Sequence, residues 1–423
     1  MESDLGSRFV RLCNYLQQPR LVASFQRLCG VKGTFADRDR DRGEPVEPDP
    51  RVQRRRVPGA ADAHSGAQED SAPGPEGPPE DEDTVRAKPL RRNSLTGDVG
   101  QEFLIHNKFL FYLFTFGTEL GNEMFFIIFF PFVLWNVDPL VSRRLIVVWA
   151  WNLFVGQSTK DMVRWSRPAS PPVVKVEVFY NSEYSMPSTH AMTGTAIPFC
   201  LFMLTYGRWE YPFVFGLSVA LLWSLLVCVS RVYMGMHSVL EVITGFFFTL
   251  LILAVLQPLL ESIDTFYMSG HYAPLVIVVS HVGFGLVTFS LDTWSTSRGD
   301  TAQALGTAAG VALATYVSYH LGLLEDYPLS SLPLAVPTLS AALVVRSLLR
   351  FVLGVAVLLL TRMGMKAVTV PFLCRMYGLP LDDVRQARQL MRVELPYRYI
   401  VYSVVGFSCV SVVPLLFNLL HLA

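Results

Sequence analysis

The chain has few charged residues and few cysteines for its length. Its 423 residues are 17% charged and 51% hydrophobic, a composition too apolar for a soluble protein of this size. The six cysteines are scattered without a CxxC pair, which excludes a disulfide framework and a cysteine-rich zinc site. Basic and acidic residues balance at 35 each, so net charge gives no indication of a nucleic-acid partner. This composition indicates a polytopic membrane protein.

The first hundred residues differ in composition from the rest of the chain. Residues 31–98 are rich in Pro, Gly, Asp, Glu and Arg and almost lack aromatic residues, which predicts a disordered tail. Residues 8–29 mix arginine with apolar residues and are too charged for a signal peptide; an amphipathic surface helix and a weakly structured basic arm both fit. In "RRNSLTG", Arg91 and Arg92 precede Ser94, which makes Ser94 a candidate phosphorylation site.

From residue 103 onward, long apolar segments follow one another closely. A hydrocarbon core about 30 Å thick needs about 20 helical residues. The sequence therefore predicts an all-α polytopic membrane protein, a helical bundle with about nine transmembrane spans. The predicted spans are 109–136, 141–159, 191–208, 211–230, 239–259, 272–291, 302–322, 338–361 and 398–420. We expect a tail over 1–100, core helices that carry the polar motifs over 101–260, and additional transmembrane helices over 261–423.

Three polar stretches border the predicted spans. They are "KDMVRWSRP" with Lys160 and Arg167, "PSTH" with Ser188, Thr189 and His190, and "SRVYMGMHSVLE" with Arg231, His237 and Glu241. One span out and one span back separate the loop 160–190 from the turn 230–237, so both face the same aqueous compartment. We therefore expect three cations, two histidines and a carboxylate at one end of the bundle.

These residue types suit phosphoryl transfer without a metal ion. Fixed positive charge for the phosphate oxygens comes from Lys160, Arg167 and Arg231. Ser188 and Thr189 open a predicted helix, whose N–H groups and dipole favour a bound anion. Taken singly, each cation has a simpler interpretation, because lysine and arginine near helix ends often reach to the membrane interface.

The two histidines suggest a nucleophile and an acid. His237 and Glu241 are four residues apart on a predicted helix and so share a face. The carboxylate can hold one ring nitrogen while the other attacks phosphorus. His190 would then give a proton to the departing alkoxide.

The three stretches resemble the signature of the type 2 phosphatidic acid phosphatase superfamily, K-x6-RP, PSGH and SR-x5-H-x3-D. The resemblance implies phosphate binding by Lys160, Arg167, Ser188, Thr189 and Arg231, with His190 as acid, His237 as nucleophile and Glu241 in the place of the family's aspartate. Two departures stand out, because Thr189 replaces the usual glycine and Glu241 is one methylene longer than aspartate.

Longer stretches are similar to the sphingosine-1-phosphate phosphatases of the vertebrate endoplasmic reticulum. They include "FGTELGNE", "RPASPPVVKVEVFYNSEYSMPSTHAM", "DTWSTSRGDTA" and "VELPYRYI", and the likeness covers most of residues 91–400. It implies hydrolysis of sphingosine 1-phosphate and dihydrosphingosine 1-phosphate in that membrane, through a phosphohistidine intermediate and without a metal or cofactor. The spans beyond residue 260 are expected to shape the entrance for the lipid tail. The segment 292–300 would contact the amino-alcohol head or form an ordinary polar loop.

Other functions fit the same sequence. Among enzymes, the alternative is a phosphatase with broad specificity for lipid phosphates, or one that acts on polyprenyl diphosphates. Charged residues within or beside spans, namely Glu119, Glu123, Arg346 and Arg350, also suit a lipid transporter. A catalytically inactive scaffold is a third reading, motivated by Glu241. Charge bias places the polar motifs in the cytosol, whereas related lipid phosphatases act on the luminal or outer face, so sidedness stays open.

Overall fold

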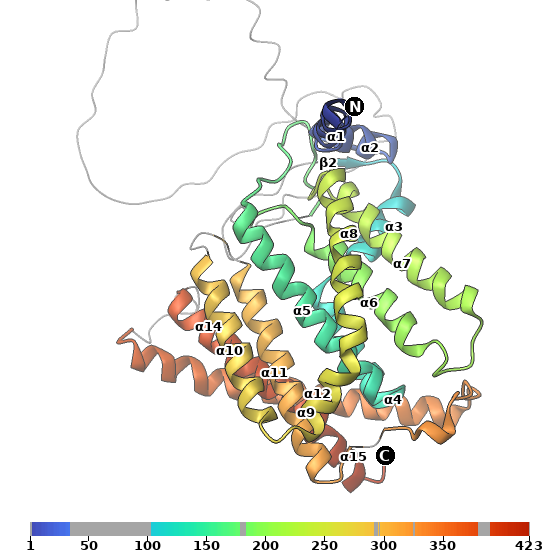
Figure 1. Cartoon of the computed structure of the whole chain (residues 1–423), viewed down its shortest axis with the longest axis vertical. Helices are drawn as coiled ribbons and strands as arrows, with labels where there is room; N and C mark the ends of the chain where they lie inside the picture. Colours follow the sequence, from blue (N-terminus) through green and yellow to red (C-terminus); the bar gives the residue numbers. More distant parts are fainter. Residues whose placement is uncertain are drawn as a thin grey trace, which may run out of the picture.

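The computed structural model describes residues 2–33, 103–177, 183–291, 295, 297–324, 326–379 and 390–422. Within these ranges the chain is almost entirely helical (Figure 1). Ser94 and nearly all of the predicted disordered tail lie outside the described residues. Residues 31–33, which the sequence assigned to that tail, instead form a strand.

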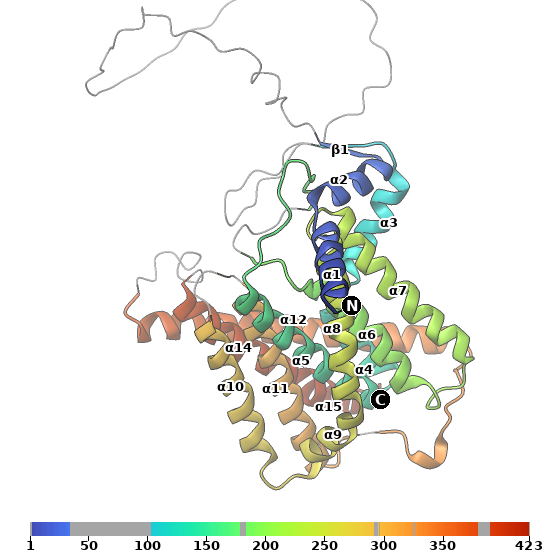
Figure 2. The same ribbon diagram turned by 45° about the horizontal axis from the view of Figure 1, so that its top comes forward.

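The helices form one N-terminal pair and two groups that lie side by side (Figures 1 and 2). The N-terminal elements are α1 (Glu2–Leu16), α2 (Pro19–Leu28) and β1 (Val31–Gly33). The first group contains β2 (Phe103–Ile105), α3 (Lys108–Glu119), α4 (Glu123–Asn136), α5 (Pro139–Val163), α6 (Thr189–Thr205), α7 (Phe213–Tyr233) and α8 (Val239–Leu256). The second contains α9 (Leu260–Ser269), α10 (Ala273–Leu291), α11 (Arg298–His320), α12 (Ala341–Met376), α14 (Met391–Phe407) and α15 (Val413–Leu419).

Five helical segments in the described part of the chain are long and apolar enough to cross a membrane. They are Phe213–Tyr233, Val239–Ser269, Ala273–Leu291, Ala341–Met376 and Met391–Leu419. Helices α3 and α4 give a sixth if they count as one span, although a 63° bend separates them. The chain is therefore a multi-pass membrane protein.

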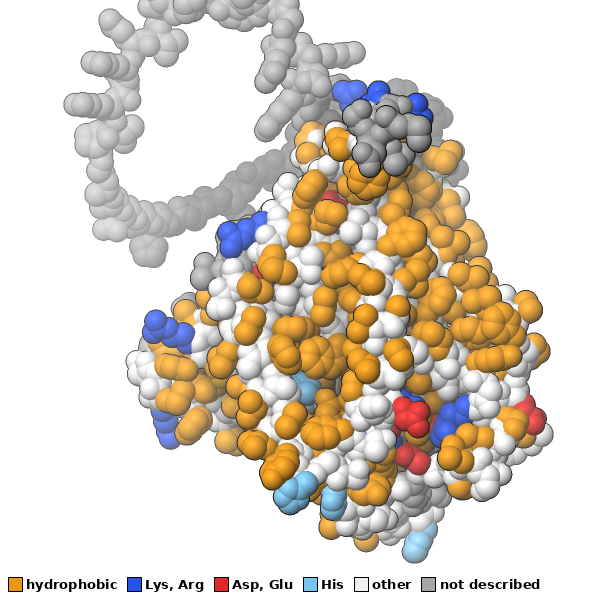
Figure 3. Space-filling model, viewed as in Figure 1, with side chains coloured by type: hydrophobic (Ala, Val, Ile, Leu, Met, Phe, Trp, Pro, Cys, Tyr) orange, Lys and Arg blue, Asp and Glu red, His pale blue; other side chains and the backbone are white. Residues whose placement is uncertain are grey.

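Three other predicted spans correspond to α5, α6 and α11, which lie inside the bundle. Helix α6 has only 17 residues, and α5 and α11 carry buried polar side chains such as Asn152, Lys160 and Gln303. A helix enclosed by other helices needs less apolar surface than one that faces lipid. The outer helices supply that surface, and Figure 3 shows hydrophobic side chains spread over the middle of the visible face.

The N-terminal segment is packed against the bundle. Helix α2 buries Gln26, whose side-chain amide donates to the backbone oxygens of Val174 (2.7 Å) and Tyr233 (2.9 Å). The same amide accepts from the N–H of Val174 at 3.0 Å. Strand β1 pairs antiparallel with β2, with Val31 opposite Ile105. Of the two readings of residues 8–29, the structure supports a helical one.

Helices α11 and α14 approach each other very closely. A Cβ at Gly310 would lie 1.9 Å from the backbone oxygen of Ser403, so only glycine fits there. At the start of α11, the hydroxyl of Ser297 donates to Asp161 of α5 at 3.2 Å. These contacts fix the first turn of α11 beside the end of α5.

We expect Gln26→Ala to destabilise the protein by about 1–3 kcal/mol, because it leaves buried backbone groups of Val174 and Tyr233 without a partner. Thermal unfolding of the purified protein in detergent, followed by loss of the monodisperse peak in size-exclusion chromatography, measures the change. Gln18→Ala, at an exposed position of the same segment, is the matched control. Equal melting temperatures for the two variants would show that α2 does not brace the bundle.

Candidate active site

Four helix ends meet at one end of the first helical group. They are the last turn of α5, the first turn of α6, the last turn of α7 and the first turn of α8. The structure brings all eight residues singled out in the three motifs to this place: Lys160, Arg167, Ser188, Thr189, His190, Arg231, His237 and Glu241. The N-terminal segment lies at the same end, because α2 contacts the loop and helix end that carry Val174 and Tyr233.

A carboxylate from the loop before α6 bridges two of the cations. Glu183 accepts from Lys160 Nζ at 2.7 Å and from Arg167 Nη2 at 2.7 Å. Lys160 also donates to the Thr189 hydroxyl at 3.1 Å. Burial favours the protonated carboxyl, but the charges of Lys160 and Arg167 outweigh it and hold the pKa of Glu183 well below its usual range. Glu183 is thus an anion held where two cations converge.

The third cation has its own acidic partner. Arg231 is 2% exposed, and its Nη1 donates to Glu177 at 2.8 Å. The preceding residue, Ser230, accepts a hydrogen bond from Thr118 of α3 at 3.2 Å. Each of the three cations is therefore paired with a carboxylate from the segment between α5 and α6, as buried charge requires.

His237 and Glu241 form a direct pair. His237 Nδ1 lies 3.1 Å from Glu241 Oε2, so the longer side chain does reach the ring. The same oxygen accepts from the N–H of Ser238 at 3.0 Å and from the hydroxyl of Ser185. The Ser238 hydroxyl in turn accepts from the N–H of Glu241, so Ser238 and Glu241 form the capping box of α8. One carboxylate thus caps the helix and orients the histidine, leaving Nε2 free of this interaction.

A tight turn places His237. Gly235 has a φ of +70°, and a Cβ there would lie 2.2 Å from the backbone oxygen of Val174, so the turn requires glycine. Lys175 Nζ donates to the Gly235 oxygen at 2.6 Å. Burial lowers the pKa of Lys175 to about 8, and the nearby charge of Arg167 adds to this effect. The loop before α6 therefore supports the turn between α7 and α8.

The electrostatics keep His237 neutral. Burial lowers the pKa of His237 well below its usual range, and the positive charges of Arg167 and Arg231 lower it further. A neutral imidazole retains a nitrogen lone pair at neutral pH, which a nucleophile needs.

A cavity of about 220 Å³ opens onto this cluster. Its polar lining consists of Asn122, Gln157, Arg167, Glu177, Glu183, Thr189, His190, Thr193, Arg231 and Asp300. His237 is 1% exposed and lies behind this lining. The backbone N–H of Ser188 donates to the backbone oxygen of Glu241 at 3.3 Å, which differs from the expectation that this N–H would face a bound anion.

Several residues of the site were missed in the sequence analysis. These are Glu177, Glu183 and Ser185, which come from the loop before α6. Asp300, in the first turn of α11, is the last residue of the segment 292–300, which the sequence offered either as a contact for the head group or as an ordinary polar loop. Charged residues concentrated in the longest loop between the early helices were the available signal for the first three.

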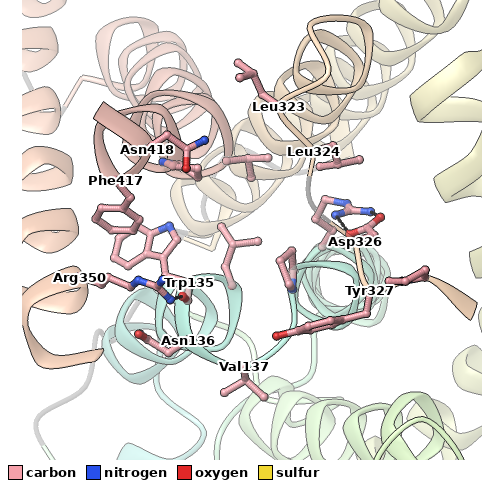
Figure 4. Close-up of a pocket in the computed structure, with 16 residues that line it drawn as sticks. Trp135, Asn136, Val137, Leu323, Leu324, Asp326, Tyr327, Arg350, Phe417 and Asn418 are labelled. Atoms are coloured by element: carbon pink, nitrogen blue, oxygen red, sulfur yellow. Dashed lines mark hydrogen bonds and ion pairs between the residues drawn. The ribbon is translucent and has the colours of Figure 1, made fainter. Parts of the chain in front are cut away.

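A larger cavity, of about 350 Å³, lies at the other end of α5 (Figure 4). Because α5 has 25 residues, about 37 Å of helix separates its two ends. The lining includes Trp135, Tyr327, Arg350 and the ion pair of Arg143 with Asp326. It contains no histidine. Of the two cavities, the smaller one is the one whose described lining includes a motif histidine, His190.

Comparison with known proteins shows which family the chain belongs to. Residues 141–261 match the model of the PAP2 superfamily. Sphingosine-1-phosphate phosphatase 1 of Mus musculus is 51% identical, over 99% of this chain and 100% of its own. Sphingosine-1-phosphate phosphatase 2 of Homo sapiens is 36% identical, over 97% of this chain and 99% of its own. The chain belongs to the sphingosine-1-phosphate phosphatase family. No solved structure matches it.

The family match confirms the resemblance seen in the sequence. The boundaries of the PAP2 match show which residues of the site lie inside it and which lie outside. Residues 141–261 include Lys160, His237 and every other residue of the three motifs. They exclude Asp300, although its side chain lines the same cavity. In this chain, part of the cavity lining thus comes from outside residues 141–261, the region that matches the PAP2 superfamily.

Proposed function

We propose that the chain hydrolyses sphingosine 1-phosphate and dihydrosphingosine 1-phosphate to the sphingoid base and phosphate. The names of the relatives that match along nearly the whole chain support this substrate class. The observation that carries the reaction type is the position of a neutral, oriented His237 beside three paired cations. The cluster contains the charge, nucleophile and acid that metal-independent phosphoryl transfer requires.

In the first step, His237 Nε2 attacks phosphorus and the bond between phosphorus and the lipid oxygen breaks. Lys160, Arg167 and Arg231 neutralise the phosphate oxygens, and Thr189 in the first turn of α6 and the hydroxyl of its N-cap Ser188 supply further donors. The negative charge of the bound phosphate favours protonation of His190, which then donates that proton to the departing alkoxide. Glu241 stabilises the positive charge that the His237 ring acquires.

In the second step, water replaces the lipid. His190, now neutral, accepts a proton from the water as its oxygen attacks the phosphohistidine. The bond between phosphorus and Nε2 breaks, and phosphate leaves with His237 restored. No metal ion or other cofactor takes part.

Glu183 must yield its place to the substrate. It now occupies the cationic centre formed by Lys160 and Arg167, where the substrate phosphate would bind. His237 lies behind the cavity lining, so displacement of Glu183 would also open the path to the nucleophile. Exchanging one anion for another preserves the charge balance of the buried cations.

The membrane arrangement follows from the same proposal. We place nine spans in the membrane, with α3 and α4 as one broken span and the inner helices α5, α6 and α11 among them. Catalysis belongs to residues 101–260, and residues 261–423 supply additional helices. The likeness to the sphingosine-1-phosphate phosphatases supports the endoplasmic reticulum as the site of action.

Phosphate release by the purified protein in detergent tests this function. We expect hydrolysis of sphingosine 1-phosphate with full activity in EDTA. When sphingosine 1-phosphate and phosphatidic acid compete at equal concentration, we expect phosphatidic acid to be hydrolysed more slowly. Preference for phosphatidic acid or a polyprenyl diphosphate would favour a broad phosphatase. Lipid transfer in vesicles without phosphate release would favour a transporter. The absence of both activities would favour an inactive scaffold.

The two histidines should differ in their dependence on the leaving group. We expect His237→Ala to abolish turnover, because no nucleophile remains. His190→Ala should lower kcat/KM, which reports the steps through departure of the leaving group, at least 100-fold on an alkyl phosphate and much less on an aryl phosphate, whose oxygen leaves without a proton. Rates with matched alkyl and aryl phosphates measure the effect. Equal losses on both substrates would remove His190 from the acid role.

Removing the charge of Glu183 should strengthen anion binding. In Glu183→Gln, phosphate analogues no longer compete with a carboxylate for Lys160 and Arg167, so we expect orthovanadate to inhibit at roughly tenfold lower concentration, about 1.4 kcal/mol. Inhibition of aryl phosphate hydrolysis provides the measurement. Glu210→Gln, at an exposed position outside the cavity, is the control. Weaker vanadate inhibition in Glu183→Gln would show that Glu183 instead holds the cations in place for the anion.

A further inference from the structure

We propose that Asp300 recognises the ammonium group of the substrate and so selects sphingoid phosphates over phosphates without an amine. This inference rests on the proposed function and adds a specificity residue to its site. Asp300 lies in the first turn of α11, outside the PAP2 region, and faces the same cavity as Arg167 and His190.

Asp300 differs from the other carboxylates of the cavity in its ion-pair partner. The lining contains two arginines and three carboxylates, Glu177, Glu183 and Asp300. Glu177 and Glu183 are paired with the cations of the phosphate site. The described ion-pair partner of Asp300 is instead Arg398 of α14, at 3.2 Å. Asp300 therefore forms no described ion pair with the phosphate-binding cations, although it lies close enough to Lys160 for the two charges to interact.

The ion pair with Arg398 does not fully neutralise the carboxylate of Asp300. Arg398 also binds Glu394, at 2.9 Å, so one guanidinium is shared between two carboxylates. The side chain of Asp300 remains 44% exposed and lines the cavity. A partly accessible carboxylate with a shared counter-charge is suited to bind a further cation.

The position of Asp300 is fixed by the backbone around it. A Cβ at Gly299 would lie 2.9 Å from Arg398 Cζ, which shows how closely α14 packs on this turn. On the other side, Ser297 binds Asp161, the residue after Lys160. Contacts with α14 and α5 thus hold the Asp300 carboxylate beside the phosphate site.

The chemistry of the substrate class fits this arrangement. A sphingoid 1-phosphate carries an ammonium on the carbon next to the one that bears the phosphate. With phosphate bound at Arg167 and Arg231, a second anion in the same small cavity is repelled unless a cation lies between them. The ammonium supplies that cation. A phosphate without an amine leaves the carboxylate and the phosphate facing each other, which disfavours its binding.

The test compares kcat/KM for sphingosine 1-phosphate with kcat/KM for its N-acetyl analogue, which has the same chain and no positive charge. In the parent protein we expect a clear preference for the amine. Asp300→Asn should reduce that preference at least tenfold, through a loss on the amine substrate and a gain on the N-acetyl analogue, which no longer meets a negative charge. Glu210→Gln is the control, because it removes an exposed carboxylate outside the cavity, and its preference should equal that of the parent.

Each other result has a distinct meaning. Equal losses on both substrates in Asp300→Asn, or an unchanged ratio, would overturn the inference, and so would a parent protein without any preference for the amine. A parent that hydrolyses phosphatidic acid but not sphingosine 1-phosphate would overturn the proposed function instead. In that case phosphoethanolamine and ethyl phosphate give the same comparison, and a lower ratio in Asp300→Asn would still support recognition of an ammonium by Asp300.

Discussion

Buried positive charge at the end of a membrane bundle is the constraint on which the site depends. Lys160 and Arg231 are 1% and 2% exposed, and such cations are strongly destabilising without partners. The protein meets this requirement with Glu183 and Glu177 from a single loop. The loop before α6 is therefore part of the electrostatic structure of the site and not only a connection between helices. In the proposed mechanism, the substrate phosphate displaces Glu183 and takes over its part in this charge balance.

The same constraint explains the division between inner and outer helices. The side chains that position the site, such as Asn152, Lys160 and Asp161, come from a helix that other helices enclose. Helices with more apolar surface surround it and face the lipid. A polar site can thus be kept at the end of a membrane protein without exposing charge to hydrocarbon, because shielding and catalysis are assigned to different helices.

The sequence was sufficient to predict which motif residues would meet. Their meeting depends only on consecutive helix ends, and counting spans placed 160–190 and 230–237 on one side. The sequence did not predict Glu183 or Ser185, because loop residues have no periodicity that says where a side chain points. It also did not predict the packing of Gln26, since a mixed basic and apolar segment fits a surface helix and a packed one equally well. Those contacts depend on tertiary structure that local patterns do not encode.

Asp300 shows how substrate choice and phosphoryl transfer are separated along the chain. The residues that would hold and attack phosphate all lie within 141–261, the region shared with the PAP2 superfamily. Asp300 reaches the cavity from α11, which is held in place by α14 through glycine contacts such as that of Gly310. A change in the second helical group can therefore alter the charge that the head group meets without moving His237 or its partner Glu241. Because the phosphate and the amine are adjacent in the substrate, the two helical groups must meet at the cavity for both to be bound at once.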